Sequence, residues 1–187
     1  SSAASDVYKR QATAFTRAVI GGAGPSFITT EEAVALNTGL PSAAAVRTVL
    51  AGNPLISAAM GPHPVGLSLG MFGGQYGPHA GAAQTVHTLI DLDTELSGPD
   101  LTRDLTIGLY DGIAAGSGIT NVTLDISVNS TLVEHHSFAS GSEAQTWFQD
   151  RAIDLGAPTA TMHIDVELSV TGTAPGDSFF GRVIMGL

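Results

Sequence analysis

The sequence predicts an all-β protein: an antiparallel β-sandwich or jelly roll with one short inserted helix, at about residues 141–151, and short N-terminal helices. Three observations lead to this prediction. Apolar and polar residues alternate with a period of two over residues 161–171, the same alternation recurs in shorter segments from Val65 onward, and turn-forming clusters separate these segments. Frequent short alternating strands favour antiparallel sheets over βαβ units.

The longest expected strand has its apolar series at Met162, Ile164, Val166, Leu168 and Val170. Because successive side chains on a strand point to opposite faces, this series forms one buried face. Shorter strands are expected at 65–69, 86–92, 105–109 and 122–128, with a last strand over 179–185. Clusters of Gly, Pro, Ser and Asp at 73–78, 97–100 and 173–177 are typical of the turns between them.

Two short helical signals precede these strands. Thr29 and Glu32 have the spacing of a capping box ahead of apolar residues at 33–36, and Ser42 precedes a second helical segment over 43–51. We therefore expect residues 12–60 to form an N-terminal extension with two short helices. Residues 61–187 are expected to form the sandwich domain.

The inserted helix begins at a capping-box signature, Ser140 followed by Glu143. Ala144, Trp147 and Phe148 then fall on one helical face. We interpret this helix as a lid across one end or edge of the sandwich. Trp147 and Phe148 are expected to be its structural anchors.

Residues 1–11 read SSAASDVYKRQ, which matches the translated adapter of a transposase-type sequencing library. We interpret them as a non-native, adapter-derived segment and the source as an environmental, metagenomic assembly. Removing the segment is expected to leave thermal stability unchanged. The natural start of the protein, with any signal peptide, is expected to lie upstream.

Charge and composition exclude several classes of function. Without Asp6, Lys9 and Arg10, 16 acidic residues and five arginines remain, with no lysine and a net charge near −11. Such a field repels nucleic acid, and the arginines are too scattered for a basic patch. The absence of cysteine excludes thiolate metal sites and thiol nucleophiles. No apolar run is long enough to predict a membrane span.

Two groups of residues are weak candidates for binding. Asp91, Asp93 and Glu95 share one face of a strand and lead into a loop with Asp100, and such oxygen ligands suit calcium. His163, Asp165 and Glu167 share one face of the longest strand, where they could hold a ligand or a metal. In both cases the alternative is an ordinary solvated strand face.

A third histidine-containing stretch, His135 and His136 after Glu134, is expected to be an exposed strand end. Neighbouring residues on a strand face opposite ways, so the two imidazoles are poorly placed to share one ion. Neither Gly-x-Ser-x-Gly nor His-Glu-x-x-His occurs. We therefore assign no catalytic residue, expect no enzymatic activity, and expect a fold that does not depend on a transition metal.

The second half of the chain resembles bacterial exported proteins that are often sorted by a PEP-CTERM tail. The resemblance covers roughly residues 65–187 and rests on the segments 104–111, 116–118 and 122–128, on Phe138, and on the motif of Glu143, Ala144, Trp147, Phe148 and Asp150 followed by Leu155 and Gly156. No Val-Pro-Glu-Pro motif or basic tail accompanies it here. It implies an extracytoplasmic, cell-surface or matrix setting with exopolysaccharide or other surface proteins as partners.

These observations favour a non-enzymatic, secreted or cell-surface β-sandwich module from a bacterium. The alternative is a carbohydrate-binding module, or a glycan-active hydrolase on a jelly-roll scaffold. Aromatic content separates these readings in part, because sugar-binding faces usually expose several Trp or Tyr side chains. This chain has one tryptophan, on the apolar face of the predicted helix.

Overall fold

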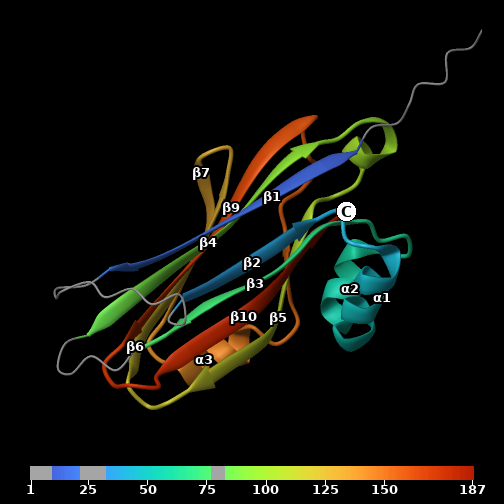
Figure 1. Cartoon of the computed structure of the whole chain (residues 1–187). Helices are drawn as coiled ribbons and strands as arrows, with labels where there is room; N and C mark the ends of the chain where they lie inside the picture. Colours follow the sequence, from blue (N-terminus) through green and yellow to red (C-terminus); the bar gives the residue numbers. More distant parts are fainter. Residues whose placement is uncertain (1–9, 22–32, 77–82) are drawn as a thin grey trace, which may run out of the picture.

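Two five-stranded antiparallel sheets pack face to face in the computed structural model, which describes residues 10–21, 33–76 and 83–187 (Figure 1). Sheet A contains, in spatial order, β1 (Gln11–Gly21), β4 (Gln84–Glu95), β9 (Thr161–Gly172), β6 (Ile119–Val128) and β7 (Thr131–Phe138). Sheet B contains β2 (Ala33–Gly39), β3 (Gly66–Gln75), β10 (Ser178–Gly186), β5 (Thr106–Ala115) and β8 (Arg151–Asp154). The predicted all-β antiparallel sandwich is confirmed.

The main core lies between the two sheets and follows the predicted alternation. On β9 the even-numbered residues from Met162 to Val170 are buried, and the odd-numbered residues between them are partly exposed. Strand β4 shows the same pattern, with Ile90 and Leu92 fully buried. The odd-numbered residues of both strands therefore form the outer, solvent-facing surface of sheet A.

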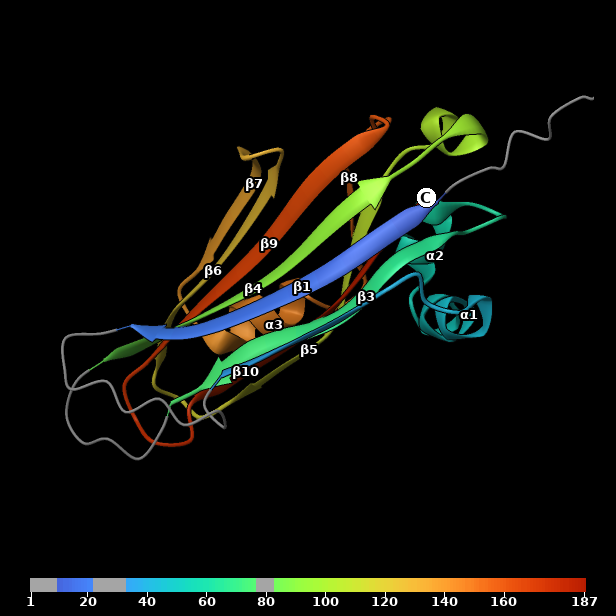
Figure 2. The same cartoon turned by 45° about the horizontal axis from the view of Figure 1, so that its top comes forward.

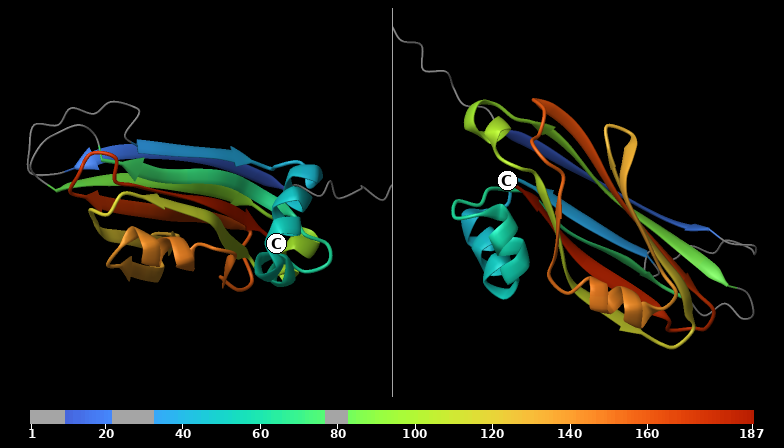
Figure 3. Two further views of the ribbon diagram at one scale, coloured as in Figure 1. Left: turned by 90° about the horizontal axis from the view of Figure 1, so that it is seen from below. Right: turned by 180° about the vertical axis from the view of Figure 1, so that it is seen from behind.

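Two helices cover part of the outer face of sheet B. α1 (Ala43–Gly52) begins at Ser42, whose hydroxyl accepts a hydrogen bond from the backbone of Ala45, and α2 (Pro54–Met60) follows it directly. They lie side by side at one end of the sheet (Figure 3). Ile56 of α2 packs on Tyr110 and Ile184, forming a second, smaller apolar cluster. The sheet A side carries no such cover in the described part of the chain.

The inserted helix α3 (Gly141–Trp147) contacts β6 and β7 of sheet A and β5 and β10 of sheet B. It therefore spans both layers at one edge, as a lid would. Its end was predicted too late, at about residue 151. The helix already ends at Trp147, with Phe148 as its C-cap. Asp150 adopts a left-handed φ of 75°, and residues 151–154 pair with β5 as strand β8.

The expected helix at residues 33–36 is wrong, because these residues open strand β2, which pairs with β3. Hydrogen bonding to a neighbouring strand outweighs a weak local helical preference. The capping residues Thr29 and Glu32 lie outside the described residues. Strands β1 and β2 contact each other across the two layers. The sandwich therefore begins at Gln11, and residues 12–60 are not a separate extension.

The last two residues of the adapter-like segment contact this fold. Nε and Nη2 of Arg10 each lie 2.7 Å from a carboxylate oxygen of Asp100, a side chain that is only 2% exposed. Gln11 opens β1 opposite Glu95. This contact argues against the expectation that removing residues 1–11 leaves thermal stability unchanged. Residues 1–9 lie outside the described residues.

Among the described residues, no helix has the length and apolar character needed to cross a membrane.

Candidate functional site on the outer face of sheet A

The candidate site lies where β4 and β9 run side by side between β1 and β6 (Figure 2). In the antiparallel register, Asp91 is directly opposite Asp165, and Asp93 is directly opposite His163. All four have odd numbers, so all four side chains leave the sheet on its outer face. Two cross-strand pairs thus place three carboxylates around one imidazole.

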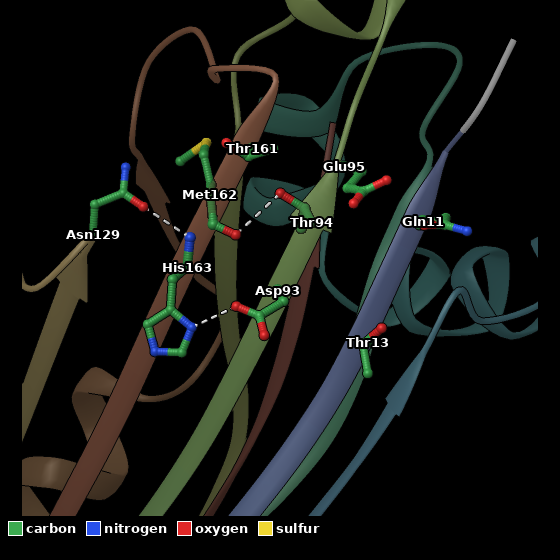
Figure 4. Close-up of a pocket in the computed structure, with 9 residues that line it drawn as sticks. All are labelled: Gln11, Thr13, Asp93, Thr94, Glu95, Asn129, Thr161, Met162 and His163. Carbon is green, nitrogen blue, oxygen red and sulfur yellow. Dashed lines mark hydrogen bonds and ion pairs between the residues drawn. The ribbon is translucent and has the colours of Figure 1, made fainter.

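The imidazole of His163 is held between two of these carboxylates. Its Nδ1 lies 2.7 Å from Oδ1 of Asp93, and its Nε2 lies 3.1 Å from Oδ1 of Asp165. The backbone N–H of His163 also donates to the side-chain oxygen of Asn129, at 2.9 Å. Figure 4 shows the contacts with Asp93 and Asn129. The ring orientation is therefore fixed from both strands.

Asp91 completes the cluster. One ligand atom from each of Asp91, His163 and Asp165 can be chosen so that all three lie within 4.8 Å of one another. Oδ1 of Asp91 is buried and has no hydrogen-bond partner, unlike every other buried side-chain nitrogen or oxygen in the described residues. The site therefore contains a carboxylate oxygen whose bonding capacity is unused.

Electrostatics in the cluster favour a positive charge. Burial raises the pKa of Asp91, and the nearby charges of Asp165 and Asp93 raise it further, while His163 lowers it. The hydrogen bond to Asp93 raises the pKa of His163, although burial opposes this shift, and the surrounding carboxylates add to it. The cluster therefore stabilises a proton on His163, as it would stabilise another cation.

A shallow depression of about 410 Å³ adjoins the cluster at the end of the two strands. Asp93 and His163 form one side of it, and Gln11 and Thr13 of β1 form the other (Figure 4). Glu95 also lines it, opposite Thr161 in the register. The depression gives solvent and small solutes access to the polar face.

The two groups of residues that the sequence suggested separately thus meet in one place. Asp91, Asp93, His163 and Asp165 form the cluster, with Glu95 one cross-strand pair further along. Glu167 instead lies 3.3 Å from His87 on the same face.

Asp100, the fourth calcium candidate, is not part of this group. It is buried in the 3₁₀ turn Gly98–Thr102 and forms the ion pair with Arg10. The loop after β4 therefore contributes none of the cluster's ligand atoms.

The adjacent histidines of β7 have separate partners, as their opposite orientations predicted. Nδ1 of His135 lies 2.5 Å from Oδ1 of Asp125, whereas the ring of His136 lies 4.4 Å from that of Trp147. Sequence reasoning missed Asn129 and Asp125 as partners of histidines. The alternation on 122–128 indicated the face of Asp125 but not the strand opposite it, and Asn129 lies in the turn after β6.

Trp147 and Phe148, the predicted anchors, lie differently. Phe148 is fully buried in the main core, where its ring centroid is 5.1 Å from that of Phe179. Trp147 is half-buried, and it packs against Phe138 with the Arg151 guanidinium 5.1 Å from its ring. Its indole lines a second open depression of about 600 Å³, together with Leu55, Glu143, Thr146 and Gln149.

No family model matches this chain, and no curated protein matches it in sequence.

Proposed function

We propose that this chain is a non-enzymatic β-sandwich module that works outside the bacterial cytoplasm, at the cell surface or in the extracellular matrix. The outer face of sheet A is its binding surface. The observation that carries this proposal is the row of aligned polar cross-strand pairs, Asp91 with Asp165 and Asp93 with His163, on a sheet face that no described helix covers. The resemblance of residues 65–187 to exported proteins supports the location.

Exopolysaccharide or another surface protein is the proposed partner class. The acidic face favours cationic groups on such a partner, or a cation that links the face to an acidic polymer. Co-sedimentation at pH 6 with cross-linked chitosan beads, which carry protonated amines, and with carboxymethyl-cellulose beads, which carry carboxylates, tests this preference. We expect retention by chitosan that falls with added salt. Equal retention by both polymers would argue against the acidic face as the binding surface.

The location is tested by fractionating cells that produce the complete natural protein and detecting it with an antibody raised against residues 33–187. We expect the protein in the surface or culture-medium fraction. Recovery in the cytoplasmic fraction alone, beside a cytoplasmic marker enzyme, would overturn the proposal.

We also infer that strands β3 to β10 follow jelly-roll order. What supports this is their nested pairing: β3 pairs with β10, β4 with β9, β5 with both β10 and β8, and β6 with both β9 and β7. Strands β1 and β2 then add one edge strand to each sheet. Jelly rolls are common scaffolds of lectin domains, so the order is compatible with a binding role.

A carbohydrate-binding module is the second candidate, because one observation favours it. Trp147 is partly exposed and lines the 600 Å³ depression, beside polar side chains that could bind hydroxyl groups. Arg151 and His136 already pack on the indole, and these contacts argue against a free sugar-stacking surface. Titration with soluble laminarin and cello-oligosaccharides decides the matter: a saturable change in tryptophan fluorescence would favour this candidate, and an unchanged spectrum would favour a purely structural tryptophan.

A further inference from the structure

We propose that Asp91, His163 and Asp165 bind one divalent transition-metal ion, such as Zn²⁺, on the outer face of sheet A. This inference concerns the chemistry of one cluster. It goes beyond the proposed location of the protein and does not depend on it.

The spacing of the ligand atoms fits one shared ion. Two ligands that share an ion at bond lengths of about 2.0 to 2.2 Å lie roughly 3 to 3.5 Å apart. Nε2 of His163 and Oδ1 of Asp165 are already 3.1 Å apart. A carboxylate oxygen of Asp91 lies within 4.8 Å of a ring nitrogen of His163 and of a carboxylate oxygen of Asp165. A small side-chain rotation of Asp91 would complete the set, while the paired strands hold the backbones in place.

The imidazole of His163 is oriented as a metal ligand would be. When Nδ1–H of His163 donates to Asp93, the lone pair is left on Nε2, which faces Asp165. Histidines that bind metals in proteins almost always donate their other ring N–H to a carboxylate or carbonyl oxygen in this way. Asp93 is therefore a positioning residue and not a ligand.

Asp91 has a buried oxygen that no hydrogen bond uses. Buried polar atoms are nearly always paired, and an unpaired carboxylate oxygen is costly. Oδ1 of Asp91 is buried without a hydrogen-bond partner, and Asp91 is the residue whose carboxylate groups with His163 and Asp165. A bound cation would supply the missing interaction, which neither strand provides.

The donor set selects the class of ion. Calcium takes six to eight oxygen ligands, whereas an imidazole nitrogen with two carboxylates suits zinc and its neighbours in the first transition row. Glu95 lies one cross-strand pair away and Asp100 is held by Arg10, so neither adds the oxygens that calcium would need. The outer side of the cluster faces solvent, which leaves room for water ligands.

Isothermal titration of the metal-free, tag-free chain with ZnCl₂ tests the proposal. We expect one saturable site in the wild-type chain and at least a tenfold loss of affinity in His163→Ala. His135→Ala is the matched control, because His135 also lies on this sheet next to an aspartate. It should bind zinc as the wild type does. Equal affinity in His163→Ala, or the same loss in His135→Ala, would overturn the proposal.

Two further variants separate metal binding from folding. Asp91→Asn should weaken zinc binding at least tenfold. It should not lower the melting temperature of the metal-free protein, because the substitution neutralises a carboxylate whose buried oxygen has no hydrogen-bond partner there. Asp93→Ala should weaken binding by about 10- to 100-fold, because it removes the hydrogen bond that orients the ring. Wild-type zinc affinity in Asp91→Asn, or tight calcium binding without zinc binding, would contradict the assignment.

Discussion

Trp147 joins the lid helix to the sandwich through ring contacts. Its ring centroid is 5.4 Å from those of both Phe138 and Phe148, and the indole is half-buried. Trp147→Ala should therefore lower the free energy of unfolding by about 2 to 3 kcal/mol, less than a fully buried tryptophan would. Urea unfolding followed by circular dichroism measures this. Trp147→Phe should retain most of the stability, and an unchanged midpoint for Trp147→Ala would show that the indole is not an anchor.

Asp177 holds together the start of β6 and the turn between β9 and β10. It is only 2% exposed and accepts hydrogen bonds from the backbone N–H groups of Gly118, Thr173 and Ala174, at 2.8 to 3.1 Å. Burial alone raises the pKa of Asp177, but these three donors lower it below its ordinary value of 3.8. Asp177→Ala should cost about 3 kcal/mol, measured by urea unfolding at pH 7.

The pH dependence of the stability lost in Asp177→Ala follows from the lowered pKa of Asp177. A carboxylate with a lowered folded-state pKa contributes stability above its unfolded-state pKa, and this contribution is lost as pH falls through the folded-state value. The difference between wild type and Asp177→Ala should therefore be full at pH 7 and shrink below about pH 4. A difference that stays constant down to pH 2.5 would show that the carboxylate charge does not matter.

Arg10, in the adapter-like segment, forms an ion pair with the sandwich. Asp100 is buried, and Arg10 contacts both of its carboxylate oxygens. Arg10→Ala should lower the free energy of unfolding by about 2 kcal/mol, because the buried carboxylate of Asp100 loses a partner that contacts both of its oxygens. Arg182→Ala is the control: it removes an exposed pair with Asp111 at 3.5 Å and should cost under about 0.5 kcal/mol. Equal melting temperatures for both variants would contradict this account.

At the scale of elements, α2 sits on sheet B because Gly108 leaves space for it. A Cβ atom at this position would lie 2.6 Å from a methyl carbon of Ile56 and 2.7 Å from one of Ile184. Gly108→Ala should therefore destabilise the protein by about 1 to 3 kcal/mol. Gly52→Ala, at the end of α1, meets no atom within 4 Å and should be neutral or stabilising. Thermal melts compare the two variants. An unchanged melting temperature for Gly108→Ala would show that α2 does not pack tightly on sheet B at this position.

The sequence predicted those strands and helices whose own residues show a clear alternation or a helix cap. The central strands β4, β6 and β9 were predicted because one face of each is buried, and α1 and α3 were predicted because Ser42 and Ser140 cap them. Strands β1, β2 and β8 were not recognised as strands. Each lies at an edge of its sheet and pairs with one neighbour, so its conformation depends on that neighbour more than on its own residues.

At the scale of the whole molecule, the candidate site depends on a pairing that no local pattern contains. Asp93 and His163 are 70 residues apart in the chain, and only the antiparallel register of β4 and β9 makes them partners. The sequence indicated which side chains share a face on each strand. It did not indicate which strands are neighbours, and a shift of one residue would have placed Asp91 and Asp165 on opposite faces.

A crystal of the wild-type chain soaked in ZnCl₂ tests the central claim most directly, namely that β4 and β9 build one cation site from two distant segments. Anomalous diffraction on either side of the zinc absorption edge locates the ion. We expect one strong peak within about 2.0 to 2.2 Å of Nε2 of His163 and of carboxylate oxygens of Asp91 and Asp165. A peak at His135 or His136 instead, or no ordered zinc between β4 and β9, would contradict the account.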